Sequence, residues 1–137
     1  MREYITKVKE FHNAFNIDNN STPTMLKRDS YKLRYNLLKE ENEEYLSACY
    51  DENIVEIADA LADQLYIVFG TILRHGLQDR IEEIFNEVHR SNMSKLENGV
   101  PLINGEGIVD HSRPFGKILK GKDFSPPNIK QILNETK

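Results

Sequence analysis

Residues 54–72 constrain the fold most, because their apolar side chains recur at the spacing of an α-helix. Successive helical residues turn by about 100°, so these side chains form one wide stripe. The stripe consists of Ile54, Ile57, Ala58, Leu61, Leu65, Val68, Phe69 and Ile72. Ala60, Tyr66 and Ile67 lie on or beside the reverse face, so the helix is apolar on most of its circumference. Such a helix is usually buried on two sides.

Helical periodicity marks three further segments. Apolar residues recur at helical spacing in residues 2–15, in about 28–48, and from Gln78 or Asp79 to about Asn98. Asn, Asp, Ser, Thr and Pro cluster in residues 16–27, which we expect to form a loop. No segment alternates strongly enough to predict a sheet. The pattern therefore predicts an all-α protein whose first hundred residues form four helices.

The connection between the second and third predicted helices is short. Residues 49–53 separate helices expected at about 28–48 and 53–74, so these two helices should be antiparallel neighbours. Asp51 or Asn53 is a suitable N-cap for the third helix. The sequence Arg-His-Gly at 74–76 is typical of a helix C-terminus followed by a glycine C′ residue.

Residues 98–137 differ in composition from the rest of the chain. Most of the glycines and prolines lie there, and helical periodicity returns only in residues 128–133. We expect an irregular arm with one short hairpin around residues 100–119. The chain is expected to form a single domain of residues 1–137, with a helical part at 1–97 and this C-terminal arm at 98–137.

Length and charge exclude several classes of protein. A chain of 137 residues suits one domain, and its net charge of −4 argues against binding to nucleic acid or to an anionic membrane surface. No apolar run is long enough to span a membrane, and no secretory signal pattern is present. Cys49 is the only cysteine, which excludes an intrachain disulfide. We therefore expect a cytoplasmic protein with no nucleic acid or membrane partner.

Acidic residues are concentrated in residues 40–63, which contain no Lys or Arg. On the second helix the acids continue an apolar stripe formed by Leu33, Leu37 and Ala48. On the third helix they line the face opposite the wide apolar stripe. Because the two helices should be neighbours, two rows of carboxylates are expected to face each other. These rows are Glu40, Glu41 and Glu44 on the second helix, and Glu56, Asp59 and Asp63 on the third.

The electrostatics of such a site favour a bound cation. Converging carboxylates repel one another, and both this repulsion and desolvation raise their pKa values. Mg²⁺, with Mn²⁺ as a substitute, relieves the repulsion because hard cations prefer oxygen ligands, and carboxylate-bound magnesium commonly serves a phosphate substrate. Di-iron bundles also use inward glutamates, but they need Glu-x-x-His pairs, which this sequence lacks. The remaining structural alternative is a solvated acidic surface.

Two acidic motifs resemble those of a known family. EENEE at 40–44 followed by EIAD at 56–59 is similar to the EExxE and ExxD motifs of the MazG-like all-α nucleoside triphosphate pyrophosphohydrolases, the superfamily that includes phosphoribosyl-ATP pyrophosphohydrolase. The resemblance spans nearly the whole chain. Its other segments are VKEFHNAFNI at 8–17, STPT at 21–24, EVHRSNMSKL at 87–96 and GKILKGKDFSPPNI at 116–129.

The resemblance implies a four-helix MazG-like bundle that is completed by oligomerisation into a homodimer or homotetramer. It implies Mg²⁺-dependent hydrolysis of a nucleoside triphosphate between the α and β phosphates, which gives a nucleoside monophosphate and pyrophosphate. Such an activity clears non-standard or surplus nucleotides from the pool. The metal ligands that it implies are Glu40, Glu41, Glu44, Glu56 and Asp59.

Three residues of the helical part have further candidate roles. Glu41 lies to one side of its row and is the candidate general base, which would accept a proton from the attacking water. Asp63 lies outside the two acidic motifs and is assigned to the substrate. Asn13 is suited to hydrogen-bond the edge of a nucleobase.

Basic and amide side chains near the C-terminal arm are candidates for phosphate binding. The resemblance points to Asn92 and Lys95, although bases at a helix end also complement the helix dipole. Lys120 and Lys122 flank Gly121, whose missing side chain lets backbone approach a phosphate closely. An ordinary solvated arm is the alternative reading of these lysines.

Two other functions stay open at this point. One is a dedicated enzyme for a single substrate, dUTP or phosphoribosyl-ATP. The other is a helical interaction module without catalysis, whose acids hold a structural metal or bind a basic partner.

Overall fold

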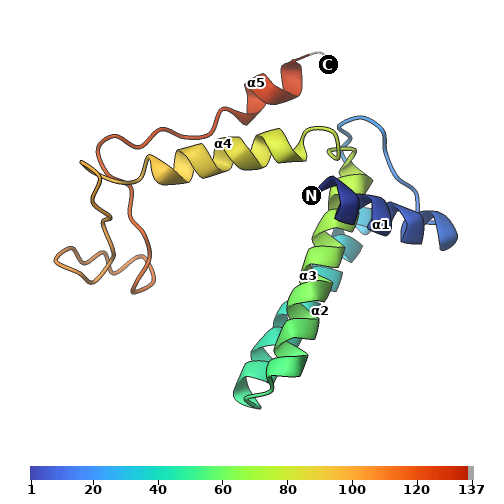
Figure 1. Ribbon diagram of the computed structural model, residues 1–137, viewed down its shortest axis with the longest axis horizontal. Helices are drawn as coiled ribbons and strands as arrows, with labels where there is room; N and C mark the ends of the chain where they lie inside the picture. Colours follow the sequence, from blue (N-terminus) through green and yellow to red (C-terminus); the bar gives the residue numbers. More distant parts are fainter. Residues whose placement is uncertain (136–137) are drawn as a thin grey trace. The chain divides into compact units, whose positions relative to one another are not determined.

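Helices form all the regular structure in the computed structural model, which describes residues 1–135 (Figure 1). The predicted all-α class is confirmed: within residues 1–135 only isolated β-bridges occur, and no strand forms. No helix of this part of the chain has the length and apolar character needed to cross a bilayer. The five helices are α1 (Arg2–Ala14), α2 (Arg28–Tyr50), α3 (Ile54–His75), α4 (Ile81–Met93) and α5 (Ile129–Asn134).

The observed bounds of α1, α2 and α3 lie close to those predicted. Helix α4 is shorter than predicted, because residues 77–80 form a turn before it, residues 94–95 form a turn after it, and Glu97 then pairs with Val100. Helix α5 adds a fifth element where the sequence showed only the short periodic segment 128–133.

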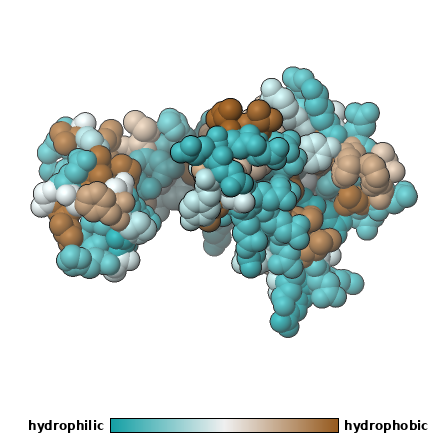
Figure 2. Space-filling model, turned by 90° about the horizontal axis from the view of Figure 1, so that it is seen from below, coloured by the Kyte–Doolittle hydropathy of each residue, from teal (hydrophilic) through white to brown (hydrophobic). Residues whose placement is uncertain are grey.

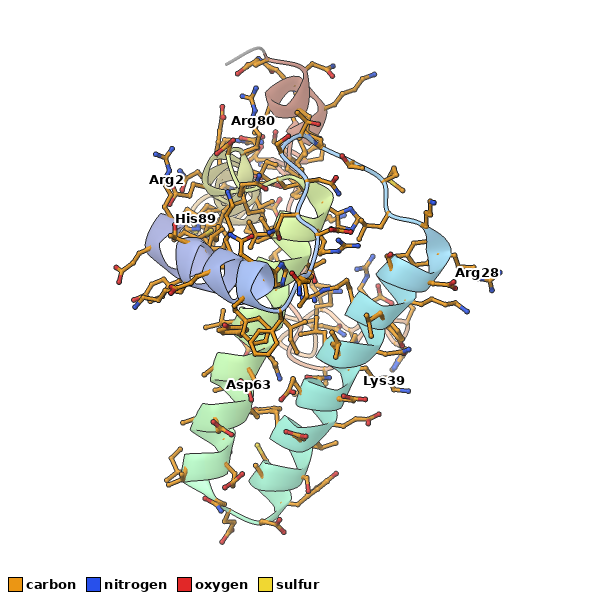
Figure 3. The ribbon with its side chains drawn as sticks, turned by 90° about the vertical axis from the view of Figure 1, so that its right-hand side faces the viewer. Arg2, Arg28, Lys39, Asp63, Arg80 and His89 are labelled. Carbon is orange, nitrogen blue, oxygen red and sulfur yellow. The ribbon has the colours of Figure 1, made fainter. Side chains whose placement is uncertain are left out.

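The chain divides into two compact units, residues 1–81 and residues 82 onward. In the first unit, α2 and α3 pack side by side as an antiparallel hairpin, and α1 packs against α3 (Figure 3). In the second unit, the segment before α5 is bound to α4. The backbone N–H of Asn128 donates to Glu87 Oε1 at 2.9 Å, and the N–H of Ser125 donates to Ser94 Oγ at 2.8 Å.

Local signals define both ends of α3. Asn53 is the N-cap, and its Oδ1 accepts hydrogen bonds from the backbone N–H groups of Val55 and Glu56 at 3.1 and 3.3 Å. Gly76 caps the C-terminus of α3 in the left-handed conformation, at φ +69°, and a Cβ there would overlap the carbonyl of Thr22. Both predicted caps are confirmed. The loop of residues 16–27 then returns across this helix end and binds its free carbonyl groups.

The core of the first unit lies between α1 and the C-terminal half of α3. It consists of Ile5, Val8, Ile72 and Leu73, with Phe69, Leu77 and Ile81 packed against it. The predicted apolar stripe of α3 is covered only at this end. Ile54, Leu61, Leu65 and Val68 are 73%, 45%, 57% and 38% exposed, respectively. One face of the molecule shows separate hydrophobic patches within a hydrophilic surface (Figure 2).

The predicted hairpin around residues 100–119 is present as a loop with a single antiparallel bridge, between Ile103 and Ile118. The centre of this loop is Asn104, which is 3% exposed. Its side chain hydrogen-bonds the backbone of residues 110–114, and this replaces the regular pairing of two strands. The second unit is therefore ordered by side-chain contacts where periodicity is missing.

Candidate active site

The face of α2 that contacts α3 is centred on Glu41. Arg34, Leu37, Leu38 and Glu41 are half-buried along this face, and Ala48 is buried. The sequence predicted a face along the row of Leu33, Leu37, Glu44 and Ala48 instead. Leu37 and Ala48 do lie on the contact face, but the prediction is wrong for Leu33, which is 56% exposed, and for Glu44, which is also exposed.

The side chain of Arg34 explains this rotation of α2. Its Nη2 donates a hydrogen bond to the carbonyl of Ile67 at 2.7 Å, and its Nε donates to Thr71 Oγ1 at 3.0 Å. Burial lowers the pKa of Arg34, and the nearby Arg74 lowers it further. A buried guanidinium needs hydrogen-bond partners, so α2 is held with Arg34 against α3.

A glycine lets two polar side chains approach the middle of α3. Gly70 is buried, and a Cβ at this position would meet Arg34 Nη2 and would lie 2.9 Å from His12 Nε2. His12 is 2% exposed, and its Nδ1 hydrogen-bonds Asn19 Oδ1 at 2.7 Å. Burial is the main cause that lowers the pKa of His12. The sequence analysis missed this cluster, although a glycine inside an apolar helix is a signal of such close packing.

Glu41 is a half-buried carboxylate in an unfavourable environment. Its Oε2 is buried and has no hydrogen-bond partner among the described residues. Burial raises the pKa of Glu41, and the neighbouring carboxylates of Glu44, Asp63 and Glu40 raise it further. Four of the predicted acids thus interact. Perturbed carboxylates of this kind are frequent at functional sites.

The remaining predicted acids are placed differently. Glu56 and Asp59 are exposed on α3 and do not contribute to the raised pKa of Glu41. In residues 1–135, no three or more carboxylate, imidazole or thiolate side chains are placed closely enough to hold a metal ion. The chemistry of the donors still suits a hard cation, because an unpartnered buried carboxylate oxygen with acidic neighbours is a good oxygen ligand.

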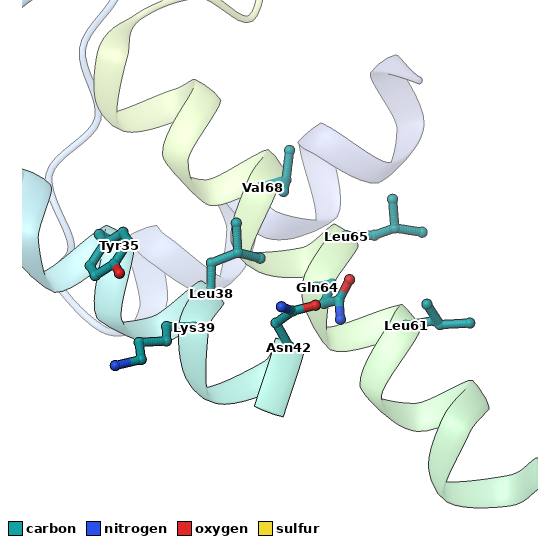
Figure 4. A pocket seen from close by; sticks show the side chains of 8 residues that line it. All are labelled: Tyr35, Leu38, Lys39, Asn42, Leu61, Gln64, Leu65 and Val68. Carbon is teal, nitrogen blue, oxygen red and sulfur yellow. The ribbon is translucent and has the colours of Figure 1, made fainter. Parts of the chain in front are cut away.

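A groove of about 690 Å³ lies between α2 and α3, and none of the predicted carboxylates lines it (Figure 4). Its lining contains both apolar and polar side chains. One of the polar side chains, Gln64, also contacts the acidic part of α2, because its Nε2 donates to the backbone carbonyl of Glu41 at 3.4 Å. The lining residues are Tyr35, Leu38, Lys39 and Asn42 of α2, and Leu61, Gln64, Leu65 and Val68 of α3.

Asn13 lines a separate cavity of about 460 Å³ in the first unit. Other amide side chains surround it, including those of Asn16, Asn19, Asn20 and Gln78. Asn19 Nδ2 donates to Asn13 Oδ1 at 3.4 Å. The amide groups in this cavity are suited to hydrogen-bond a polar ligand.

The predicted phosphate-binding residues belong to the second unit. Asn92 is exposed at the end of α4. Lys95 and Lys120 line one cavity together, so the structure brings these two lysines to the same place. Lys122 is exposed and does not line that cavity.

Residues 8–92 match the sequence profile of the family described as phosphoribosyl-ATP pyrophosphohydrolase. The match covers more than half of the chain and includes both acidic motifs. The chain belongs to this family. Its resemblance to the MazG-like all-α superfamily is thereby confirmed. The protein is therefore a pyrophosphohydrolase, which is a hydrolase that acts on phosphoric anhydrides. No curated protein matches the chain significantly.

Removal of the charge on Glu41 is expected to stabilise the metal-free protein at neutral pH. The folded-state pKa of Glu41 is raised above the ordinary value of 4.5, so its ionisation destabilises the fold as the pH rises through that raised value. Glu41→Gln should therefore increase the midpoint of urea unfolding at pH 7 in EDTA. It should also reduce the loss of stability between pH 4.5 and pH 8.

Glu43→Gln is the matched control, because Glu43 is exposed on the same helix and forms only a 3.8 Å ion pair with Lys39. Such surface pairs contribute little to stability. If Glu41→Gln is no more stable than Glu43→Gln at pH 7, Glu41 is not destabilised by its neighbours.

Proposed function

We propose that the protein is a Mg²⁺-dependent nucleoside triphosphate pyrophosphohydrolase. It cleaves between the α and β phosphates and releases a nucleoside monophosphate and pyrophosphate. The family supports hydrolysis of a phosphoric anhydride. The observation that carries the proposal is the unpartnered, half-buried oxygen of Glu41, whose pKa is raised by burial and by three acidic neighbours.

The carboxylates of Glu40, Glu41, Glu44, Glu56 and Asp59 would hold the metal, with Mn²⁺ as a substitute for Mg²⁺. Their side chains would have to move closer together on binding, because in residues 1–135 no three of these groups are close enough to hold an ion. When bound, the cation would neutralise the phosphate charge and lower the pKa of a coordinated water. In the metal-free protein, a cation is favoured at Glu41 because its Oε2 has no hydrogen-bond partner among the described residues and its charge is repelled by Glu44, Asp63 and Glu40.

Glu41 is also the proposed general base. Its carboxylate lies among the acids that would hold the metal, so it would be within reach of a metal-coordinated water and could accept a proton from it. Its side chain is half-buried against α3, and its Oε2 is buried. Asp63 borders the same group from α3 and is proposed to contact the substrate.

Other polar residues are proposed to bind nucleotide groups. In the second unit, Lys95 and Lys120 share a cavity and would neutralise phosphate charge, and Asn92 and Lys122 would add phosphate contacts. Asn13, in its amide-lined cavity, would hydrogen-bond the base.

The proposed role is the clearance of non-standard or surplus nucleotides from the cytoplasmic pool. A dedicated phosphoribosyl-ATP pyrophosphohydrolase is the second candidate, because the matching family carries that description. Both candidates use the same carboxylates, and they differ only in the nucleotide that is accepted. The same acids would also serve a dUTP-specific enzyme.

We further propose that a second copy of the chain covers the exposed stripe of α3, so that the protein is a homodimer or homotetramer. Leu61, Leu65 and Val68 are exposed and also line the groove of about 690 Å³ beside Leu38. A wide apolar helix face is usually buried, and C2 symmetry is the commonest way for identical chains to cover it.

Pyrophosphate release should be measured over a panel of nucleoside triphosphates together with phosphoribosyl-ATP. We expect activity with Mg²⁺ and none in EDTA. Glu41→Gln should lower kcat by roughly 100-fold or more, since it removes the general base. Glu43→Gln should keep wild-type activity, and Glu44→Ala should lose metal-dependent turnover. Activity in EDTA, or full activity of Glu41→Gln, would contradict the proposed chemistry.

Leu65→Glu is expected to dissociate the oligomer, because it places a charge in the middle of the stripe that a second copy would cover. Light scattering during size-exclusion chromatography should give an oligomer for the wild type and a monomer for the variant. Met25→Glu is the control, because Met25 is 86% exposed in a loop outside the groove. A monomeric wild type, or an oligomeric Leu65→Glu protein, would argue against this interface.

A further inference from the structure

A cavity of about 400 Å³ lies among the loops of the second unit. Four of its lining residues are cations, namely Lys95, Arg113, Lys117 and Lys120, and its only acid is Asp110. All of these residues belong to the same compact unit. The volume is within the range of roughly 300–1,000 Å³ that is usual for small-molecule sites.

Asn104 fixes the part of the loop that carries Arg113 and Lys117. Its Nδ2 is shared among the carbonyl groups of Asp110, Arg113 and Pro114, at 3.0, 3.0 and 3.1 Å. Its Oδ1 accepts from the backbone N–H of Asp110 at 2.7 Å, and its own N–H donates to the carbonyl of Lys117 at 2.8 Å. One buried amide therefore sets the backbone on both sides of the cavity.

A second backbone contact places Lys120 beside Lys95. The N–H of Gly121 donates to the carbonyl of Lys95 at 3.0 Å. A Cβ on Gly121 would lie 2.9 Å from that carbonyl oxygen, so only glycine permits the approach without a shift. The ammonium group of Lys120 lies 4.6 Å from the centre of the Phe124 ring, which restricts that side chain.

The charge of this cavity is not neutralised by the protein itself. Asp110 already binds Arg113, with 3.3 Å between Oδ2 and Nε, and it accepts two hydrogen bonds from Ser112. Those bonds from Ser112, followed by the charge of Arg113, lower the pKa of Asp110. Within residues 1–135, no carboxylate forms an ion pair with Lys95, Lys117 or Lys120. Three ammonium groups thus share a cavity whose one carboxylate, Asp110, is already paired with Arg113.

The remaining lining is apolar and consists of Ile108, Ile118 and Leu119. These side chains give the uncharged part of a ligand a surface to contact. The cavity is therefore suited to a ligand that has several negative charges close together.

We infer that this cavity is an oligophosphate-binding site that works without a metal ion, and that Arg113 and Lys117 bind phosphate there together with Lys95 and Lys120. Three or four cations match a chain of two or three phosphates better than they match a single phosphate. The assignment of these linked phosphates to the nucleotide substrate, or to its pyrophosphate product, rests on the proposed function.

Calorimetric titration of the full-length protein in EDTA tests this inference. Tripolyphosphate and pyrophosphate should bind more tightly than orthophosphate, and affinity should fall as salt increases. Lys117→Ala should weaken tripolyphosphate binding about tenfold through loss of one charged contact, whereas Lys117→Arg should keep most of it. Lys130→Ala is the control, because Lys130 is exposed on α5 outside the cavity.

The inference is overturned if tripolyphosphate does not bind in EDTA, if Lys117→Ala and Lys130→Ala behave alike, or if a single-stranded oligonucleotide binds more tightly than tripolyphosphate. Hydrolysis assays on the same preparations separate the two proposals. A protein that binds tripolyphosphate but hydrolyses no nucleotide contradicts only the proposed function. A protein that hydrolyses nucleotides with Mg²⁺ but does not bind tripolyphosphate in EDTA contradicts only the inference about this cavity.

Discussion

The position of Glu41 depends on the contact that Arg34 makes with α3. A buried guanidinium is costly unless its N–H groups find acceptors, and Arg34 finds them in the carbonyl of Ile67 and the hydroxyl of Thr71. Glu41 lies two helical turns further along the same face of α2, so the rotation that satisfies Arg34 also turns Glu41 toward α3. Its carboxylate is then partly desolvated beside other acids, and its pKa is raised.

The features that could be predicted from sequence are those with local causes. The caps at Asn53 and Gly76 and the periodic helices α1 to α3 follow from backbone chemistry and from apolar spacing. The rotation of α2 could not be predicted in the same way. Arg34 is polar, so a pattern that counts only apolar residues places it outside the buried stripe. Its partners lie on α3, more than thirty residues away in the sequence, so no local signal points to them. The interaction of Asp63 with Glu41 has the same non-local origin.

The sequence predicts burial of α3 on two sides, but it does not tell which molecule covers each side. One chain covers the end near Ile72 and leaves Leu61 and Leu65 exposed. Residues 98–121 pose a different difficulty, because they lack periodicity and are organised by a single buried amide, Asn104. In the sequence, the glycine between Lys120 and Lys122 indicated a place where backbone can approach a phosphate closely. Only the folded loop, however, brings Arg113 and Lys117 to the cavity that Lys95 and Lys120 line.

The central claim is that Glu41 is held in a place where its charge is unfavourable until a cation binds. The most direct measurement is the pKa of the Glu41 carboxyl group by NMR titration, with and without Mg²⁺. The account predicts a pKa above the ordinary 4.5 in EDTA and a clear decrease when Mg²⁺ is added. A pKa at or below the ordinary value in EDTA that does not respond to Mg²⁺ would contradict it.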